Sequence, residues 1–224
     1  MTALIDVKDV GKRYERGGRP FWALRHASLT VSAGEFVTLL GRSGSGKSTL
    51  LNIIVGLLQP TEGEALLCGT PLKGLADEKA SALRNKMVGY VPQGAGVLST
   101  LSVIDNVRLP WYLASRGAEP EGRAQALLDE VGLGALANQF PSALSGGELR
   151  RVAIARALMT SPKVIVADEP TSSLDLETAR QVVKIFKALS EKGAAVLMVT
   201  HDASSVDLSD RLYDMAEGVL SVRS

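Results

Sequence analysis

The sequence predicts an α/β fold in which a mostly parallel core sheet is preceded by an antiparallel β subdomain and interrupted by a helical subdomain. Three observations support this prediction. Several short runs are almost entirely apolar, which is typical of parallel strands covered on both faces. One of these runs passes directly into a glycine-rich turn and a helix-compatible segment, as at the start of a parallel α/β unit. The β pattern then disappears between Gln93 and Ser145.

The N-terminal region, residues 1–40, alternates short β-like runs with polar turns. The runs are Leu4 to Val7, Ala27 to Val31 and Glu35 to Leu40. Short runs of this kind, bounded by turn residues, are typical of strands in an antiparallel sheet. We therefore expect a small antiparallel sheet that leads into a core strand.

The remaining core strands are expected where the chain becomes nearly continuously apolar. These runs are Lys86 to Val91, Lys163 to Ala167 and Ala195 to Thr200. Their character suits strands that helices cover on both faces, so we expect a doubly wound sheet.

The middle of the chain has a helical pattern instead. Ser102 to Ser115 and Glu121 to Val131 look helical, and the helix breakers Gly117 and Pro120 separate them. We interpret residues 94–145, approximately, as a helical subdomain inserted into the sheet.

The composition fits one catalytic domain that spans residues 1–224, because 46% hydrophobic content allows a substantial core. The net charge is only +1, from 25 basic and 24 acidic residues, so no overall field attracts nucleic acid or an acidic membrane. The longest apolar run, Leu50 to Leu58, is too short to span a bilayer, and no secretory signal is visible. We expect a cytoplasmic protein whose single cysteine, Cys68, is a small buried residue.

The segment "GRSGSGKST" fits the phosphate-loop pattern G-x-x-x-x-G-K-[ST] and lies between an apolar strand and a helix-compatible run. It predicts a P-loop NTPase core that binds the phosphates of a nucleotide together with Mg²⁺. Glycines let backbone N–H groups close around phosphate oxygens, Lys47 can reach the β- and γ-phosphates, and the Ser48 hydroxyl can enter the Mg²⁺ shell. The candidate binding residues are Gly41, Arg42, Ser43, Gly44, Ser45, Gly46, Lys47, Ser48 and Thr49.

The segment "KVIVADEP" is an apolar strand that ends in two adjacent carboxylates, Asp168 and Glu169. Side chains alternate along a strand, so the two carboxylates are expected to point differently and to take separate roles. Asp168 is placed to hold Mg²⁺ through water. Glu169 is placed to orient an attacking water or to accept its proton.

Two further strands end in polar residues. His201 follows "VLMVT" and Gln93 follows "VGYVP", and ligands of open α/β sheets collect at the carboxyl ends of the strands. His201 is a candidate partner of the γ-phosphate or of the attacking water, and Gln93 is a candidate sensor of the metal. Taken alone, a histidine is more often structural, and a surface glutamine needs no function.

A second anion-ready turn lies in "ALSGGELRR". Ser145, Gly146 and Gly147 precede a segment from Glu148 to Leu158 whose alanines, leucines and arginines favour a helix. The turn would present unpaired N–H groups and the positive end of the helix dipole. Many helices begin with serine and glycine, so this signal alone is modest.

Together these motifs resemble the nucleotide-binding subunit of ATP-binding cassette (ABC) proteins. The sequence "LSGGE" followed by "ADEP" and "VTHD" is far more specific than the phosphate loop alone. The matching segments, in the family's order, are Gly41 to Thr49, Gln93, Leu144 to Glu148, Val164 to Glu169, Ser173-Leu174-Asp175 and His201.

The resemblance implies a head-to-tail dimer with a second copy of the chain or a homologous ATPase subunit. The phosphate loop of one subunit and the turn formed by Ser145, Gly146, Gly147 and Glu148 of the other would enclose one ATP. It also implies that Tyr14 stacks on adenine, that Gln93 couples the site to a partner, that Asp175 crosses the dimer interface and that Glu169 is the catalytic base. Phe21 and Trp22 lie near Tyr14, and any of these aromatic residues could belong to the core.

The segments "QGAGVLSTLSVIDNVRLP" and "VADEPTSSLD" are most similar to the ABC branch that serves lipoprotein release, macrolide efflux and cell division. The chain departs from the usual pattern at three places. Leu149-Arg150 stands where glutamine is common, Ser172-Ser173 replaces Gly-Asn, and Pro92 stands where an aromatic residue is frequent. None of these changes removes a catalytic group.

The leading hypothesis is therefore an ATPase subunit at the cytoplasmic face of the cell membrane. Integral membrane permease subunits would dock on residues 94–142, and ATP binding and hydrolysis would close and open the dimer to drive export or lipoprotein/macrolide-type force transmission. The alternative is a soluble ABC ATPase that acts on DNA or ribosomes, but the chain shows no second cassette, coiled-coil insertion or basic extension. We thus expect no nucleic-acid partner. A P-loop kinase or GTPase would leave "LSGGE" and His201 unexplained.

Overall fold

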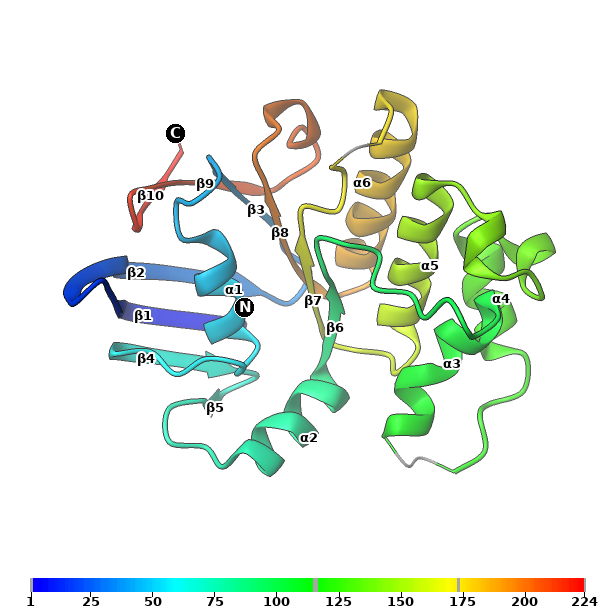
Figure 1. The fold of residues 1–224 in the computed structure, drawn as a ribbon, viewed down its shortest axis with the longest axis horizontal. Coiled ribbons are helices and arrows are strands. Elements are labelled where there is room, and N and C mark those ends of the chain that lie inside the picture. Colours follow the sequence, from blue (N-terminus) through cyan, green and yellow to red (C-terminus); the bar gives the residue numbers. More distant parts are fainter. Residues whose placement is uncertain (1, 115–116, 173, 224) are drawn as a thin grey trace.

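The protein has two sheets that lie side by side and a group of helices beyond the larger sheet (Figure 1). The structure is a computed structural model, and it describes residues 2–114, 117–172 and 174–223. One sheet has four strands in the order β2-β1-β4-β5, and the other has six in the order β10-β9-β3-β8-β7-β6. The predicted fold class is confirmed, including the antiparallel β subdomain and the inserted helical subdomain.

The antiparallel sheet is built on a long hairpin of β1 (Ala3–Arg16) and β2 (Arg19–Ser32). The hairpin turns at Gly17 and Gly18, which have φ values of 58° and 72°, a backbone region that favours glycine. The remaining two strands are β4 (Glu62–Leu67), which pairs with β1, and the short β5 (Thr70–Pro71).

The core sheet joins strands from distant parts of the chain. In parallel pairing, β9 (Arg211–Ala216) is followed by β3 (Phe36–Gly41), β8 (Ala195–Thr200), β7 (Val164–Asp168) and β6 (Val88–Val91). At the edge, β10 (Val219–Val222) pairs with β9 in antiparallel orientation. The sheet is thus mostly parallel, as predicted.

Both faces of this sheet are covered, which explains why its strands are so apolar. Val164 and Val166 of β7 pack in a core with α1 (Lys47–Ile54) and the antiparallel sheet. Ile165 and Ala167 of the same strand pack in a second core with the helices of the other face. Alternation of side chains along the strand therefore divides the apolar residues between two cores.

The helical subdomain lies between two neighbouring strands of the core sheet. It contains α3 (Val103–Leu113), α4 (Arg123–Glu130), the short 3₁₀ turns η1 (Gly134–Leu136) and η2 (Pro141–Ala143), and α5 (Gly146–Leu158). β6 and β7 pair directly in parallel, so these elements all lie in the connection between two neighbouring strands. Ser115, the predicted end of the first helix, is outside the described residues. The limits 94–145 remain a prediction.

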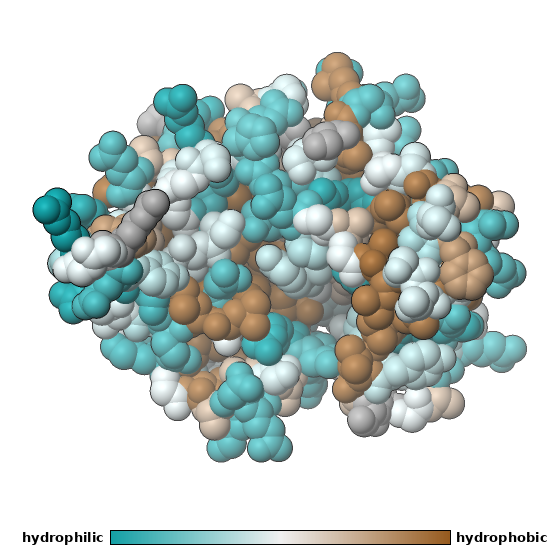
Figure 2. Space-filling model, in the orientation of Figure 1, coloured by the Kyte–Doolittle hydropathy of each residue, from teal (hydrophilic) through white to brown (hydrophobic). Residues whose placement is uncertain are grey.

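Several elements were not predicted individually from the sequence, among them three helical ones. The helix α2 (Asp77–Met87) precedes β6, α6 (Leu176–Glu191) covers one face of the core sheet, and η3 (Ala203–Ser205) follows β8. Figure 2 shows apolar side chains gathered toward the helical subdomain, whereas polar side chains dominate the hairpin end. Within the described part of the chain, no helix combines the length and apolar character needed to cross a membrane.

Candidate active site

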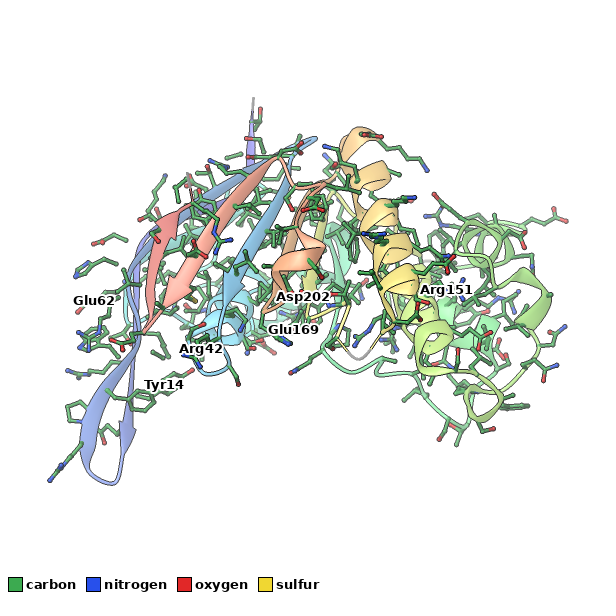
Figure 3. All side chains as sticks on the ribbon, turned by 90° about the horizontal axis from the view of Figure 1, so that it is seen from above. Tyr14, Arg42, Glu62, Arg151, Glu169 and Asp202 are labelled. Carbon is green, nitrogen blue, oxygen red and sulfur yellow. The ribbon has the colours of Figure 1, made fainter. Side chains whose placement is uncertain are left out.

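A cavity of about 870 Å³ opens where the core strands end, beside the β1–β2 hairpin. The phosphate loop, three strand ends, the hairpin and the β9–β10 turn all contribute to its wall. Its lining residues are Tyr14, Phe21, Trp22, Ala23, Arg25, Arg42, Ser43, Gly44, Gly46, Lys47, Ser48, Thr49, Gln93, Asp168, Glu169, His201, Glu217 and Gly218. Figure 3 shows Tyr14, Arg42 and Glu169 along the same edge of the molecule.

The phosphate loop connects β3 to α1 in a conformation that requires glycine. Gly46 precedes α1 with a φ of 109°, and a Cβ there would lie 2.4 Å from the carbonyl oxygen of Ala23. Gly41 closes β3, where a Cβ would lie 2.6 Å from Ser45 Oγ. Tight backbone packing therefore explains these two glycines before any ligand is considered.

Lys47 lies on the inner side of this loop and is almost fully buried. Its Nζ donates to the carbonyl oxygens of Gly41 and Arg42, at 2.7 and 3.0 Å, and lies 3.6 Å from Glu169 Oε1. The loop thus holds a buried positive charge at its centre. Such a charge, beside the N-terminus of a helix, attracts a phosphate.

Ser48 and Asp168 form a pair of oxygen donors suited to Mg²⁺. The Ser48 hydroxyl donates to Asp168 Oδ2 at 3.2 Å, which joins the start of α1 to the end of β7. Burial raises the pKa of Asp168, although the Ser48 hydrogen bond and the charges of Lys47 and Arg150 oppose that shift. A hydroxyl and a carboxylate are hard ligands of the kind Mg²⁺ prefers, so the residues present fit this ion.

Glu169 follows Asp168 with a φ of 50°, a left-handed conformation that is unfavourable for a non-glycine residue. Its amide nevertheless donates to the carbonyl of Val199 at 2.8 Å, so the backbone stays paired with β8. The buried carboxylate places Oε2 2.6 Å from His201 Nδ1. Asp168 and Glu169 therefore contact different groups.

Gln93 and His201 line the same cavity from two further strand ends. His201 follows β8, and its side chain is about 60% exposed, whereas the side chain of its partner Glu169 is buried. Gln93 follows β6 and Pro92 and is exposed to the cavity. The structure thus brings the polar ends of three neighbouring strands to one place.

An aromatic surface closes the hairpin end of the cavity. Tyr14 and Phe21 face each other in the β1–β2 register, and their rings stack with centroids 5.8 Å apart and planes at 26°. Trp22 lies beside them in the cavity wall. Tyr14 is therefore a half-buried residue of the cavity wall, beside the exposed Phe21, rather than a core residue.

Sequence reasoning missed four lining residues: Ala23 and Arg25 of β2, and Glu217 and Gly218 in the turn between β9 and β10. The Gly218 amide donates to the Ser45 carbonyl at 3.0 Å, and its carbonyl accepts from the Arg25 amide at 2.8 Å. This turn therefore joins the phosphate loop to the hairpin. A lone Glu-Gly pair between two short strands carries no signal in the sequence that would have identified it.

The second glycine turn is absent from the cavity wall. Ser145 caps α5 by accepting from the Glu148 amide at 3.3 Å, and the Glu148 carboxylate accepts from the Ser145 amide at 2.7 Å. Hydrogen bonds from Ser145 lower the pKa of Glu148. A Cβ on Gly146 would meet open space, whereas one on Gly147 would lie 3.0 Å from Thr178 Cγ2. The turn is exposed, and one of its glycines allows close packing on α6.

Asp175 is also absent from the cavity wall. It caps α6 by accepting from the Thr178 amide at 3.0 Å and from the Thr178 hydroxyl at 2.6 Å, and these bonds lower its pKa. Its neighbour Ser173 is outside the described residues. Asp175 and the Ser145 turn therefore form a second, exposed group near Thr178, separate from the phosphate loop.

Comparison with known proteins gives a consistent result. Residues 24–172 match the family model described as ABC transporter. The lipoprotein-releasing system ATP-binding protein LolD of Alcanivorax borkumensis is 41% identical over 223 residues, which are 98% of this chain and 97% of that protein. The macrolide export ATP-binding/permease protein MacB of Syntrophobacter fumaroxidans is 40% identical over 225 residues, or 99% of this chain. This chain spans only 32% of that protein's length.

A solved structure supports the same relationship. The dimeric structure of a post-hydrolysis state of the ATP-binding cassette MJ0796, bound to ADP and Pi, superposes with a TM-score of 0.90. The two chains are 36% identical, and the match covers 98% of this chain and 99% of that one.

Proposed function

The chain belongs to the ABC transporter family and is an ATPase, and from this premise we propose that it is the ATP-hydrolysing subunit of a membrane transport complex. It acts as one domain over residues 1–224 and pairs head to tail with a second copy or a homologous subunit. Each ATP then lies between the phosphate loop of one subunit and the Ser145 turn of the other.

One observation carries this proposal. The chain has two anion-ready turns before helices, but only the phosphate loop lines the 870 Å³ cavity. Ser145 and Gly146 of the second turn are exposed, and a Cβ on Gly146 would face open space. An anion held by the second turn therefore comes from another molecule, and the dimeric cassette among the solved relatives supports a second subunit as its source.

In the phosphate-loop half, backbone N–H groups and Lys47 bind the phosphates of ATP. Ser48 and Asp168 would hold Mg²⁺, and Gln93 lies in the same cavity wall. When bound, Mg²⁺ neutralises charge on the β- and γ-phosphates. Tyr14, with its stacked neighbour Phe21, offers a flat apolar surface to adenine.

Glu169 is the proposed catalytic base. Its buried carboxylate lies between Lys47 and His201, at 3.6 and 2.6 Å, which fixes its position beside the phosphate loop. A fixed carboxylate can orient a water for attack on the γ-phosphate and accept its proton. His201 orients Glu169 and is itself exposed toward the cavity, where it can donate to the γ-phosphate.

A groove between α2 and α3 is the proposed docking place of the permease subunits. It has a volume of about 390 Å³, and Leu57 and Leu113 at its edges are 56% and 70% exposed. Figure 2 shows apolar side chains beside the hollow in this region. Exposed leucines around a groove are typical of a protein interface. We also propose a position at the cytoplasmic face of the membrane, and export or force transmission of the lipoprotein or macrolide type. The names of the relatives LolD and MacB support this part of the proposal.

The test of this proposal is Glu169→Gln, which keeps the shape of the side chain and removes the base. We expect turnover to fall by about 10²- to 10⁴-fold, the usual contribution of a general base. ATP binding should persist, and light scattering after size exclusion with ATP and Mg²⁺ should show a dimer.

The matched control is Glu62→Gln, which changes an exposed glutamate of β4 outside the cavity wall. It should retain the parent rate. Robust hydrolysis by Glu169→Gln would remove Glu169 from the role of base. A Glu169→Gln protein that remains monomeric with saturating ATP would contradict the composite site.

A further inference from the structure

Helix α5 holds the segment that follows β6 through two arginines. Arg150 donates from Nη1 to the carbonyl of Pro92 at 2.6 Å and from Nη2 to the carbonyl of Gln93 at 2.5 Å. Arg156 donates to the carbonyls of Gly96 and Ala95, at 2.6 and 3.1 Å. The backbone on both sides of Gly94 is therefore tied to one helix, and the strand end that carries Gln93 cannot shift independently of α5.

Arg150 differs from Arg156 in reaching a second functional segment. Its Nη2 lies 3.5 Å from Ser172 Oγ, and the Ser172 hydroxyl donates to the carbonyl of Glu169 at 2.9 Å. One guanidinium thus contacts the backbone of Gln93 directly and the backbone of Glu169 through a single hydroxyl. The geometry suits arginine, whose planar group carries several donors in a fixed arrangement.

The surroundings of Arg150 indicate a position under constraint. The residue is only 6% exposed, and its hydrogen bonds go to carbonyl and hydroxyl oxygens rather than to a carboxylate. Burial lowers its pKa, while the nearby charge of Asp168 opposes that shift. Burying a charge that has no bonded countercharge costs free energy, so the hydrogen bonds of the guanidinium are needed to offset that cost.

The contacts of Arg150 with the carbonyls of Pro92 and Gln93 lie close to the second glycine turn, because Arg150 and the turn both belong to the start of α5. Arg150 follows Gly146 by about one helical turn on α5. A second cavity of about 290 Å³ lies between these segments. It is lined by Gln93, Ala95, Gly146, Leu149, Arg150, Ser172 and Leu174.

We propose that Arg150 is a positioning residue that makes the placement of Gln93 and Glu169 depend on the position of α5. When the turn at the start of α5 binds the nucleotide of the partner subunit, α5 moves as a rigid rod. Arg150 then carries the Gln93 backbone with it and adjusts the Glu169 backbone through Ser172. Engagement of one composite site is thereby transmitted to the hydrolytic groups of the other. This inference rests on the proposed dimer.

The first test is Arg150→Gln, because a glutamine amide can replace at most one arm of the guanidinium. We expect kcat to fall about tenfold, the scale of one hydrogen bond to a charged donor, while ATP affinity stays within about twofold. Arg150→Lys keeps the positive charge but lacks the planar guanidinium. Its kcat should lie between the kcat of the parent and that of Arg150→Gln. Arg223→Gln, which breaks an exposed ion pair with Asp214, is the matched control and should leave kcat unchanged.

The deciding measurement is a double-mutant cycle with Gly146→Ala, a mild change at a position where a Cβ meets no atom. If Arg150 relays nucleotide binding at the Ser145 turn to the hydrolytic groups, the two substitutions interrupt the same relay. The kcat of the double variant should then be close to the kcat of the slower single variant. Losses that multiply, or an unchanged kcat in Arg150→Gln, would overturn the proposal. If Arg150→Gln unfolds at a clearly lower temperature than the parent, Arg150→Lys takes its place in the double-mutant cycle. Dimer formation by Glu169→Gln, measured separately, distinguishes failure of this inference from failure of the proposed function.

Discussion

The phosphate loop and the Ser145 turn are both glycine-rich turns before a helix, yet their surroundings differ. Lys47 is buried in the phosphate loop, where it contacts two carbonyls and Glu169. The Ser145 turn satisfies its own donors through a capping box and faces solvent. The comparison teaches that a local motif provides donors, whereas the tertiary surroundings decide whether those donors face the chain's own cavity or another molecule.

Glycine is present in the two turns for different reasons. A side chain at Gly46 would collide with the Ala23 carbonyl at 2.4 Å, so this glycine is required by the monomer. A side chain at Gly146 would meet no atom of the described chain within 4 Å. If Gly146 is needed, the reason lies outside the monomer, and substitutions there separate assembly from folding.

The largest effect on this comparison is expected from Lys47→Ala, which removes the buried charge of the phosphate loop. Loss of a charged donor to phosphate should weaken ATP affinity by about a hundredfold. Equilibrium titration of the monomer with ATP and Mg²⁺ measures this change. Lys192→Ala, which removes an exposed ion pair with Glu130, is the control. Unchanged affinity in Lys47→Ala would count against the phosphate-loop assignment.

A smaller effect, of the opposite kind, is expected from Gly146→Asp. The monomer has room for the side chain, so folding and ATP binding should be retained. Turnover should fall by about thirtyfold, because a carboxylate would face the partner's phosphates across the interface. Gly146→Asn tests size without charge and should lose less. Hydrolysis at the parent rate in Gly146→Asp would show that the composite site is wrong for this protein.

The smallest effect is expected from Glu148→Ala, which removes half of the capping box on α5. The free energy of unfolding should fall by about 1 kcal/mol, as for other lost helix caps, and urea denaturation measures it. The pKa of Glu148 is lowered by Ser145, so its contribution is present above the ordinary glutamate pKa. It is lost as the pH falls through the lowered value.

Glu148→Gln keeps an acceptor for the Ser145 amide and is the matched control. It should retain most of the stability but lose the dependence on acid pH. The measured quantity is the difference in unfolding free energy between the parent and Glu148→Gln. If this difference is the same at neutral and acid pH, the assigned role of the carboxylate is wrong.

The predictable part of the fold is the part with a strong local pattern. The strand Ala195 to Thr200 was predicted with the observed limits, and Lys163 to Ala167 differs by one residue at each end, because buried parallel strands are uniformly apolar. The strands β9 and β10 were missed. β9 pairs with β3, which lies far away in the sequence, and β10 is a short strand at the edge that pairs with β9 alone.

The same division applies to the candidate site. Gln93, Asp168, Glu169 and His201 were located from the sequence because each follows an apolar strand, and the structure places all of them in one cavity wall. Arg150 was noted only as a departure from a familiar pattern. Its contacts with Pro92 and Gln93 join residues 57 or more positions apart, which no local pattern can reveal.

The sequence by itself determined which groups can bind phosphate and Mg²⁺, because those groups follow from residue type and from the turn before a helix. It also determined that the chain has two anion-ready turns, although the phosphates of one nucleotide need only one of them. Only the tertiary structure decided that the two turns face different surroundings, that Glu169 adopts a left-handed conformation against His201, and that Arg150 connects α5 to both strand ends. The physical reason is that donors and charges are local properties, whereas burial and contact depend on which distant segments the sheet brings together.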